Sequence, residues 1–192
     1  MRTEWEAAFW PVEKDDVRRR LREAGATLVY EERLMRRVIF HLPSDAPLTG
    51  GWARVRDEGD KVTLCVKQVG TTMEDQKELE VQVSNYDDAI EILKSLGCID
   101  KAYQETKREL WELGGAEIML DEWPFLEPLV EVEGPSEEVV KDAAERLMFE
   151  WETAIFDTVD LLYSRKYGVE RRILTTGTGA RLTFDIPNPF QT

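Results

Sequence analysis

Apolar and charged residues alternate along several short stretches of this chain. The clearest stretch is Trp52–Lys67, in which two alternating runs flank the turn sequence Asp57-Glu58-Gly59-Asp60. Alternation with a period of two predicts β-strands, because successive side chains leave a strand on opposite faces. A short polar connection that contains glycine favours a tight turn between such strands. The stretch is therefore predicted to be a β-hairpin with one apolar face and one cationic face.

Similar alternation predicts six further strands, and the segments between them carry apolar residues at the spacing of amphipathic helices. The further strands are expected at about residues 2–10, 27–41, 75–83, 102–111, 116–122 and 129–133. Helices are expected at about residues 15–24, 87–96, 136–149 and 157–167. We predict an α+β fold, in which an eight-stranded antiparallel β-barrel carries the α-helices on its outside.

Charged residues recur on these strands as same-sign pairs two positions apart. The pairs are Arg54 and Arg56, Glu4 and Glu6, Glu78 and Glu80, and Glu131 and Glu133. The simplest interpretation is that they form the solvated outer faces of antiparallel strands. That interpretation gives no reason for like charges to lie side by side, where they repel one another. If the sheet closes, the same residues line its lumen, and the cations there need anions or a polyanionic ligand.

The 192 residues carry a formal net charge of −14, and 42% of them are hydrophobic. This size and composition predict a globular domain with a core of its own. A strongly acidic chain is not expected to bind nucleic acid in general, because that binding needs a basic surface. An anion site enclosed within the fold is compatible with an acidic exterior.

No apolar run approaches the ~20 residues that a membrane helix needs, and no secretory signal begins the sequence. We therefore expect no contact with a membrane and a cytoplasmic location. The two cysteines, Cys65 and Cys98, fit reduced thiols, and no Cys/His cluster indicates zinc. For His41, the only histidine, a role as general base and a structural role at a strand end are both open.

The order of the charged motifs is similar to that of a known family. The motifs are Glu4-Trp5-Glu6, Arg54-Val55-Arg56, Lys67, Glu78-Leu79-Glu80, Lys107-Arg108-Glu109, Asp121 and Glu131-Val132-Glu133. In this order and spacing, residues 2–167 resemble the CYTH superfamily of triphosphate tunnel metalloenzymes. The superfamily includes class IV adenylyl cyclases, thiamine triphosphatases and inorganic triphosphatases. The resemblance implies an eight-stranded antiparallel barrel, or tunnel, whose lumen binds a small-molecule triphosphate and divalent cations.

The resemblance also implies roles for charged residues of the lumen. The residues expected to bind the triphosphate are Arg37, Arg54, Arg56, Lys67, Arg108 and Lys166. The expected metal ligands are Glu4, Glu6, Asp121, Glu131 and Glu133, and the residues expected to act in catalysis are Glu4, Glu6, Lys67 and Arg108. Glu78 and Glu80 are either metal ligands or partners of the cations. Arginine forks match phosphate oxygens, and carboxylates without His or Cys suit Mg²⁺ or Mn²⁺.

The first motif departs from the family pattern Glu-x-Glu-x-Lys, because Ala8 stands at the lysine position. An acidic and aromatic motif that the family often has in its second strand is replaced here by Arg36-Arg37-Val38-Ile39-Phe40-His41. Our hypothesis is that Arg37 restores the cation that is lost at Ala8. The alternative is a lumen with one cation fewer.

The function expected first is that of a metal-dependent phosphohydrolase acting on tripolyphosphate or on an organic or nucleoside triphosphate. One alternative is an adenylyl cyclase that makes cyclic AMP from ATP, although no adenine-reading motif is visible. Another is a non-catalytic protein that binds nucleotides or polyphosphate, for which Ala8 is the best support. A lumen that holds only compensating ion pairs is the structural alternative, but apolar side chains would fill a barrel at less cost.

Residues 1–168 are expected to form the tunnel domain, and residues 169–192 a C-terminal tail outside the resemblance. Within the tail, Arg171–Leu174 and Ala180–Phe184 flank the sequence Thr-Thr-Gly-Thr-Gly and are expected to form a small β-hairpin. Whether the tail packs on the barrel, contacts a second copy in a homodimer or stays mobile is left open by the sequence.

Overall fold

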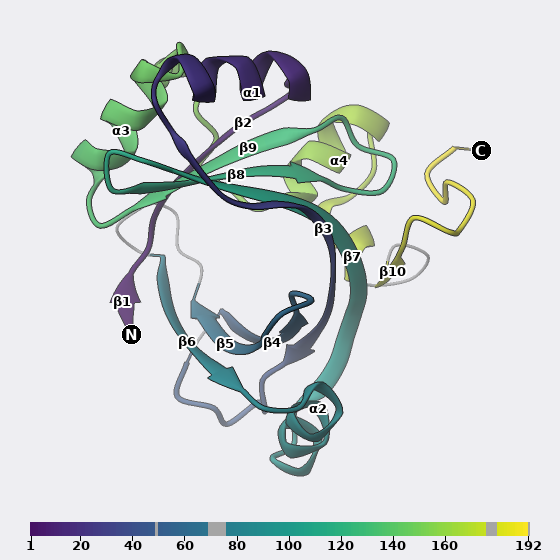
Figure 1. Ribbon diagram of the computed structural model, residues 1–192. Helices are drawn as coiled ribbons and strands as arrows, with labels where there is room; N and C mark the ends of the chain where they lie inside the picture. Colours follow the sequence, from purple (N-terminus) through teal and green to yellow (C-terminus); the bar gives the residue numbers. More distant parts are fainter. Residues whose placement is uncertain (49, 69–75, 176–179, 192) are drawn as a thin grey trace.

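The computed structural model describes residues 1–48, 50–68, 76–175 and 180–191 (Figure 1). Its strands are β1 (Arg2–Thr3), β2 (Trp5–Phe9), β3 (Thr27–His41), β4 (Gly51–Asp57), β5 (Val62–Gln68), β6 (Lys77–Val83), β7 (Ile99–Leu113), β8 (Ala116–Glu122), β9 (Leu129–Gly134) and β10 (Arg181–Leu182). Its α-helices are α1 (Lys14–Glu23), α2 (Tyr86–Ser95), α3 (Glu137–Arg146) and α4 (Asp160–Tyr167). The 3-10 helices η2 (Trp151–Thr153) and η3 (Arg171–Leu174) follow α3 and α4.

The strands form a nearly closed antiparallel barrel in the order β1-β6-β5-β4-β3-β7-β8-β9-β2. The N-terminal stretch joins the two ends of this sheet, because β1 pairs with β6 and β2 pairs with β9. Between β1 and β2, the backbone N–H of Glu4 donates to the carbonyl of Gln76 at 3.0 Å. The fold class predicted from the sequence, an antiparallel barrel with external helices, is thus confirmed.

The expected number of eight strands is wrong for the described part of the chain, which contains ten. One extra strand arises because the N-terminal stretch divides at Glu4, where it passes from β6 to β9. The other is β10, a two-residue strand that runs parallel to β7. The start of the strand expected at residue 75 lies outside the described residues.

The tail differs from the expected hairpin. Arg171–Leu174 is a 3-10 helix, and Arg181–Leu182 pairs with β7 instead of with that segment. Residues 176–179, which include most of the expected turn, lie outside the described residues. Leu174 and Leu182 are buried in one apolar cluster with Leu162 and Tyr163 of α4, so burial of these side chains holds the described tail against the barrel. The division at residue 168 stays a prediction.

Helices cover the apolar outer faces of the barrel at two places (Figure 1). Helices α1 and α3 pack on β2, β8 and β9, where Phe9, Leu120 and Val132 are buried in their shared cluster. Helix α2 packs on β3 and β4, where Phe40 and Val55 are buried. Because apolar side chains of these strands face the helices, the alternating charged side chains point into the lumen.

The ends of two helices follow from capping chemistry in the sequence. The side chain of Asn85 accepts a hydrogen bond from the backbone N–H of Asp88 at the start of α2. Ser136 does the same for Val139 at the start of α3, and both helices carry acidic residues in the first turn. Within the described residues, no helix is long and apolar enough to cross a membrane.

Candidate active site

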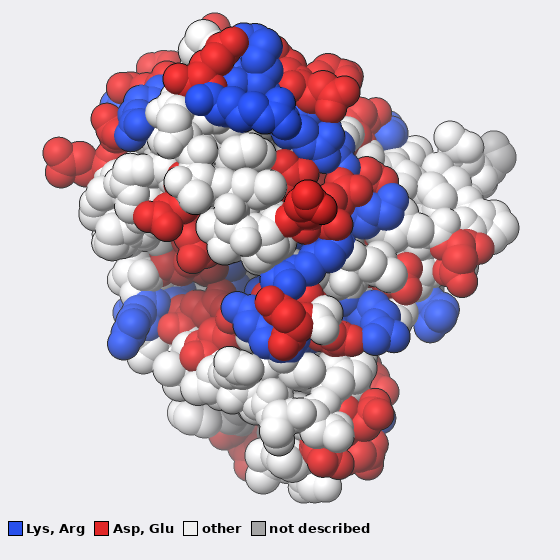
Figure 2. Space-filling model, viewed as in Figure 1, with Lys and Arg blue, Asp and Glu red and all other residues white. Residues whose placement is uncertain are grey.

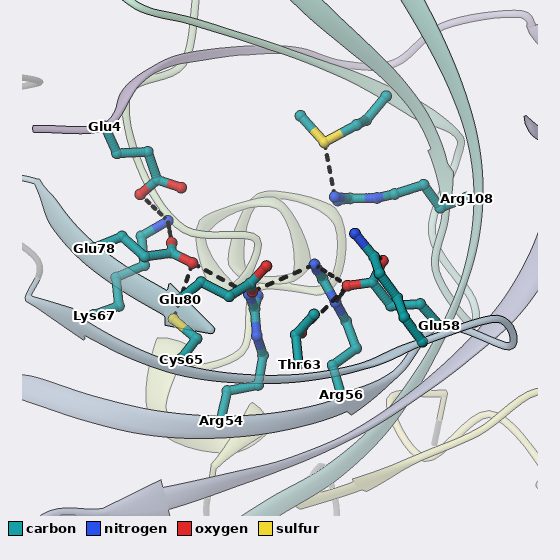
Figure 3. Close-up of polar contacts among 12 residues, drawn as sticks. Glu4, Arg54, Arg56, Glu58, Thr63, Cys65, Lys67, Glu78, Glu80 and Arg108 are labelled. Atoms are coloured by element: carbon teal, nitrogen blue, oxygen red, sulfur yellow. Dashed lines mark hydrogen bonds and ion pairs between the residues drawn. The ribbon is translucent and has the colours of Figure 1, made fainter. Parts of the chain in front are cut away.

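The hairpin that carries the cations, formed by β4 and β5, pairs along its edge with β6, a strand that carries carboxylates. Strand β4 supplies Arg54 and Arg56, and β5 supplies Lys67. In the register of β5 with β6, Lys67 lies opposite Glu78, and Cys65 lies opposite Glu80. Figure 3 shows these side chains rising from the sheet toward one another and toward the middle of the barrel. The charged pairs therefore line the lumen and not a solvated outer face.

Lys67 connects β5 to the N-terminal stretch. Its Nζ lies 2.6 Å from Oε2 of Glu4, 3.5 Å from Oε2 of Glu6 and 3.8 Å from Oε2 of Glu78. One ammonium group therefore lies among three carboxylates that come from both ends of the sheet. This cluster supplies an ionic contact across the place where the barrel closes.

Arg54 and Arg56 have carboxylate partners at the centre of the lumen. Nη2 of Arg54 lies 2.8 Å from Glu80 and 3.4 Å from Glu78. Nη2 of Arg56 lies 2.7 Å from Glu58 and 3.7 Å from Glu80. Glu58 was missed by the sequence interpretation, which placed it in the turn between the two strands and gave it no role. It is only 2% exposed and also accepts a hydrogen bond from Thr63. No local signal distinguishes it, because turn residues of this type are usually solvated.

Arg108 approaches from β7 on the opposite wall (Figure 3). It lies across from Asp121 in the β7–β8 register, and its Nε donates to Oδ1 of Asp121 at 2.7 Å. Its Nη2 donates to Asp121 and, at 2.5 Å, to Glu131. Asp121 is fully buried. Burial raises the pKa of Asp121 to about 6, although the Arg108 charge opposes the shift.

Arg37 differs from the other cations of the lumen. Its Nε and Nη2 donate to the amide oxygen of Gln104 at 3.0 and 2.9 Å, and its guanidinium carbon lies 4.3 Å from the ring centroid of Trp123. Among the described residues, no carboxylate lies within ion-pair distance of Arg37. Burial and the charges of Arg54 and Arg56 lower its pKa to about 9.

A second group of carboxylates gathers where β2, β8 and β9 meet. Glu6 lies opposite Glu133 in the β2–β9 register, and Glu131 lies opposite Ala8. Glu133 forms no ion pair or side-chain hydrogen bond with any other described residue. Burial, together with the charge of Glu6, raises its pKa to about 7. Burial also raises the pKa of Glu4 to about 9, against the charge of Lys67. Carboxyl groups held close together in this way need a cation or protons to offset their repulsion.

Potential ligand atoms of Cys65, Glu78 and Glu80 lie within 4.8 Å of one another and form an acidic group that could hold a metal ion. The thiol of Cys65 donates to Glu78 at 3.0 Å, and burial raises its pKa, which keeps it protonated. Arg54 contacts both carboxylates of this group. A cation at this place would therefore have to displace Arg54.

Lys166 is the one residue expected to bind triphosphate that the structure does not place with the others. It lies on α4, with Nζ 2.7 Å from Glu127 in the segment before β9. Its contacts among the described residues involve no charged residue of the lumen. The remaining expected site residues are brought together inside the barrel.

A cavity of about 400 Å³ lies outside the barrel, between α1 and the strands β3 and β7. Arg18, Glu109 and Trp111 line it, and they bond to one another: Nη2 of Arg18 lies 2.9 Å from Glu109, and Trp111 donates to Glu109 at 2.7 Å. This cavity does not include the lumen residues. Figure 2 shows charged side chains of both signs around a recess in the face of the molecule that it presents.

The pKa shifts predict a pH dependence of stability. In the absence of metal, the chain is expected to become less stable as the pH rises from about 5 to about 8. Raised pKa values mean that the folded chain keeps protons on Glu4 and Glu133 that the unfolded chain has already lost. This contribution is complete at acid pH and is lost by about pH 7 for Glu133 and about pH 9 for Glu4. Thermal unfolding in a chelator at both pH values measures it.

His41 has the opposite effect on the pH dependence of stability. Burial lowers the pKa of His41, so the neutral form is favoured in the folded state. The comparison is therefore best made in a His41→Gln background. Glu4→Gln combined with Glu133→Gln is expected to flatten the pH profile. A higher unfolding temperature at the more alkaline pH would contradict the assignment.

A family model described as the CYTH domain matches residues 11–162. The fold is similar to that of a protein from Pyrococcus horikoshii, with 24% identity, 83% of this chain and 98% of that chain covered, and a TM-score of 0.67. A protein from Vibrio parahaemolyticus described as a candidate adenylate cyclase has 14% identity, coverage of 85% and 98%, and a TM-score of 0.72. A candidate adenylyl cyclase from Hippeastrum, described as having a dominant triphosphatase activity, has 14% identity, coverage of 86% and 96%, and a TM-score of 0.55. No curated protein matches the chain significantly. At these identities the likeness to solved structures shows the fold alone.

Proposed function

Because the chain belongs to the CYTH domain family, we propose that it is a metal-dependent phosphohydrolase that acts on tripolyphosphate or a small organic triphosphate in the barrel lumen. The observation that carries this proposal is the convergence of cations from four strands inside one barrel. The cations are Arg37, Arg54, Arg56, Lys67 and Arg108. A polyphosphate offers the matching multiple charge, and planar guanidinium groups suit its oxygens.

Most of these cations contact carboxylates of the lumen. A triphosphate would replace Glu80 at Arg54 and Glu58 at Arg56, and the released carboxylates would repel the bound anion unless a cation lies between them. A barrel that only had to be stable could be filled with apolar side chains instead. The charged filling therefore supports binding of an anion together with a metal ion.

The carboxylates fit a hard divalent cation, Mg²⁺ or Mn²⁺. The residues proposed to hold it are Glu4, Glu6, Asp121, Glu131 and Glu133. They offer oxygen donors without histidine, and Glu133 has no other partner among the described residues. When bound, such an ion supplies charge neutralisation at the phosphoryl oxygens and lowers the pKa of a bound water molecule.

The chain's own residues would do the positioning. Arg54, Arg56 and Arg108 would hold the phosphate oxygens from two opposite walls, which keeps the phosphorus atoms in line with an attacking water. Lys67 lies between Glu4, Glu6 and Glu78, so it would hold the proposed metal ligands Glu4 and Glu6 in place and add a positive charge beside the phosphate. Because the barrel surrounds these groups, bulk water competes less with each contact.

Phosphorus-31 NMR with Mg²⁺ tests this function. Tripolyphosphate is expected to give inorganic phosphate and pyrophosphate, and ATP is expected to lose phosphate if organic triphosphates are accepted. An adenylyl cyclase would instead convert ATP to cyclic AMP and pyrophosphate. A non-catalytic binder would leave both compounds intact while shifting their resonances. If neither turnover nor binding is seen, the proposal is refuted, and the charges of the lumen serve only to compensate one another.

The predicted cytoplasmic location, the absence of nucleic-acid and membrane partners and the homodimer stay predictions. None of them is needed for the chemistry proposed above.

A further inference from the structure

Arg37 combines free N–H donors with the lack of a carboxylate partner among the described residues. A guanidinium has five N–H donors, and Gln104 accepts from only two of them. The other three have no acceptor among the described residues. Gln104 is neutral, so Arg37 keeps its full charge, whereas each of the other four cations lies within 4 Å of a carboxylate. A phosphate that meets Arg37 therefore has no ion pair to break.

Gln104 is itself fixed by a residue far away in the sequence. It is 2% exposed, and its amide nitrogen donates to the backbone carbonyl of Leu174 at 3.2 Å. The carbonyl can only accept and the guanidinium can only donate, so the two partners together set which way the amide points. The orientation of the Gln104 oxygen toward Arg37 therefore depends on the position of η3.

The C-terminal tail is attached to the same part of β7. Leu182 of β10 pairs with Gln104 in the parallel register and is fully buried. Beyond it, the backbone N–H of Phe184 donates to Glu105 at 3.1 Å, and Lys107 lies 4.5 Å from the Phe184 ring centroid. Contacts at three nearby positions of β7 thus hold the described tail beside Gln104. The family match ends at residue 162, before any of these tail residues.

We propose that the C-terminal tail is part of the anion site, in which the Leu174 carbonyl orients Gln104 and Gln104 holds Arg37 in place to receive a phosphate group of the substrate. This inference rests on the proposed function, since it assigns Arg37 to the same triphosphate. Gln104 is a positioning residue in this scheme, and Arg37 is the group that touches the substrate. The arrangement also explains how a lumen with Ala8 in place of a lysine keeps its cation.

Calorimetric titration of tripolyphosphate, without and with Mg²⁺, tests the scheme. Arg37→Met and Gln104→Met are each expected to weaken binding about tenfold, the scale of one hydrogen bond to a charged group. The double variant is expected to bind no more weakly than Arg37→Met, because Gln104 acts only through Arg37. Gln82→Met is the matched control: it removes a glutamine whose side chain makes no hydrogen bond with other described residues, and its binding should equal that of the unmodified protein.

Leu182→Asp examines the tail itself. The charge at a buried position should detach β10 and weaken binding as much as Gln104→Met does, with no further loss when the two are combined. If this variant fails to fold, Leu182→Ala, which shortens the same buried side chain without adding a charge, takes its place and is expected to weaken binding in the same direction. Unchanged binding in Gln104→Met or in a folded Leu182 variant, or additive losses in the double variant, would overturn the inference.

Arg54→Met separates this inference from the proposed function. If the unmodified protein binds tripolyphosphate and Arg54→Met weakens it while Gln104→Met does not, the tail has no role but the proposed function stands. If the unmodified protein does not bind tripolyphosphate under either condition, the proposed function fails as well.

Discussion

Replacement of Arg108 by methionine is expected to lower the free energy of unfolding by about 3–5 kcal/mol at neutral pH and to abolish triphosphate hydrolysis. Arg108 donates to both Asp121 and Glu131, and Asp121 has no exposure to solvent. Methionine fills similar space but leaves the buried carboxylate of Asp121 and the half-buried carboxylate of Glu131 without this cation. Chemical denaturation and a phosphate-release assay measure the two effects.

Three measurements separate the charge effect from a packing defect. Arg108→Met combined with Asp121→Asn should recover much of the lost stability, because the second change removes a buried charge. Lower pH should help the single variant, since the raised pKa of Asp121 allows it to take up a proton. Mg²⁺ should help it too, by compensating the same carboxylates. Equal destabilisation of the single and double variants would show that charge compensation is not the reason.

Loss of divalent-metal binding is expected in Glu4→Gln combined with Glu6→Gln, while the barrel remains folded. Both carboxylates face the lumen and lie beside Lys67, which keeps Glu78 as a partner at 3.8 Å when they are gone. Changes in groups that merely support metal ligands typically cost 10–100-fold in affinity, so removal of two ligands should weaken Mg²⁺ or Mn²⁺ binding by more than about 100-fold. Calorimetry with each metal ion and circular dichroism measure binding and folding.

The matched control is Glu137→Gln combined with Glu138→Gln, which makes the same change in net charge. These two residues are exposed in the first turn of α3, which lies on the outside of the barrel (Figure 1). Metal affinity should be unchanged in this control. The ligand assignment would be refuted if both double variants bound Mg²⁺ and Mn²⁺ as well as the unmodified protein does.

Much of the fold could be predicted because alternation is a local property. A strand presents every second side chain to one face, so Arg54 and Arg56 had to share a face wherever the strand lay. Capping is local as well, because Asn85 and Ser136 accept from backbone groups only three positions away. The number of strands could not be predicted in the same way. The division at Glu4 depends on pairing with β6 and β9, which are distant from Glu4 in the sequence.

The site was predicted in outline and not in its pairings. The sequence indicated which charges share the lumen, but it could not show that Glu58 bends back from the turn to Arg56. It also could not show that Lys166 lies with Glu127 instead of with the lumen cations. Both outcomes depend on the path of segments between strands, which local periodicity does not constrain.

By itself, the sequence determined which side chains share a face of each strand. The resemblance to a family of tunnel proteins implied that the cations and carboxylates would share one enclosed space. Only the tertiary structure decided which side chains form ion pairs and hydrogen bonds with one another. Side-chain period and capping act over a few residues, whereas the contacts of Arg108 with Glu131 and of Gln104 with Leu174 join positions 23 and 70 residues apart. Closure of the barrel and docking of the tail bring such positions together, and their partners are set by that geometry.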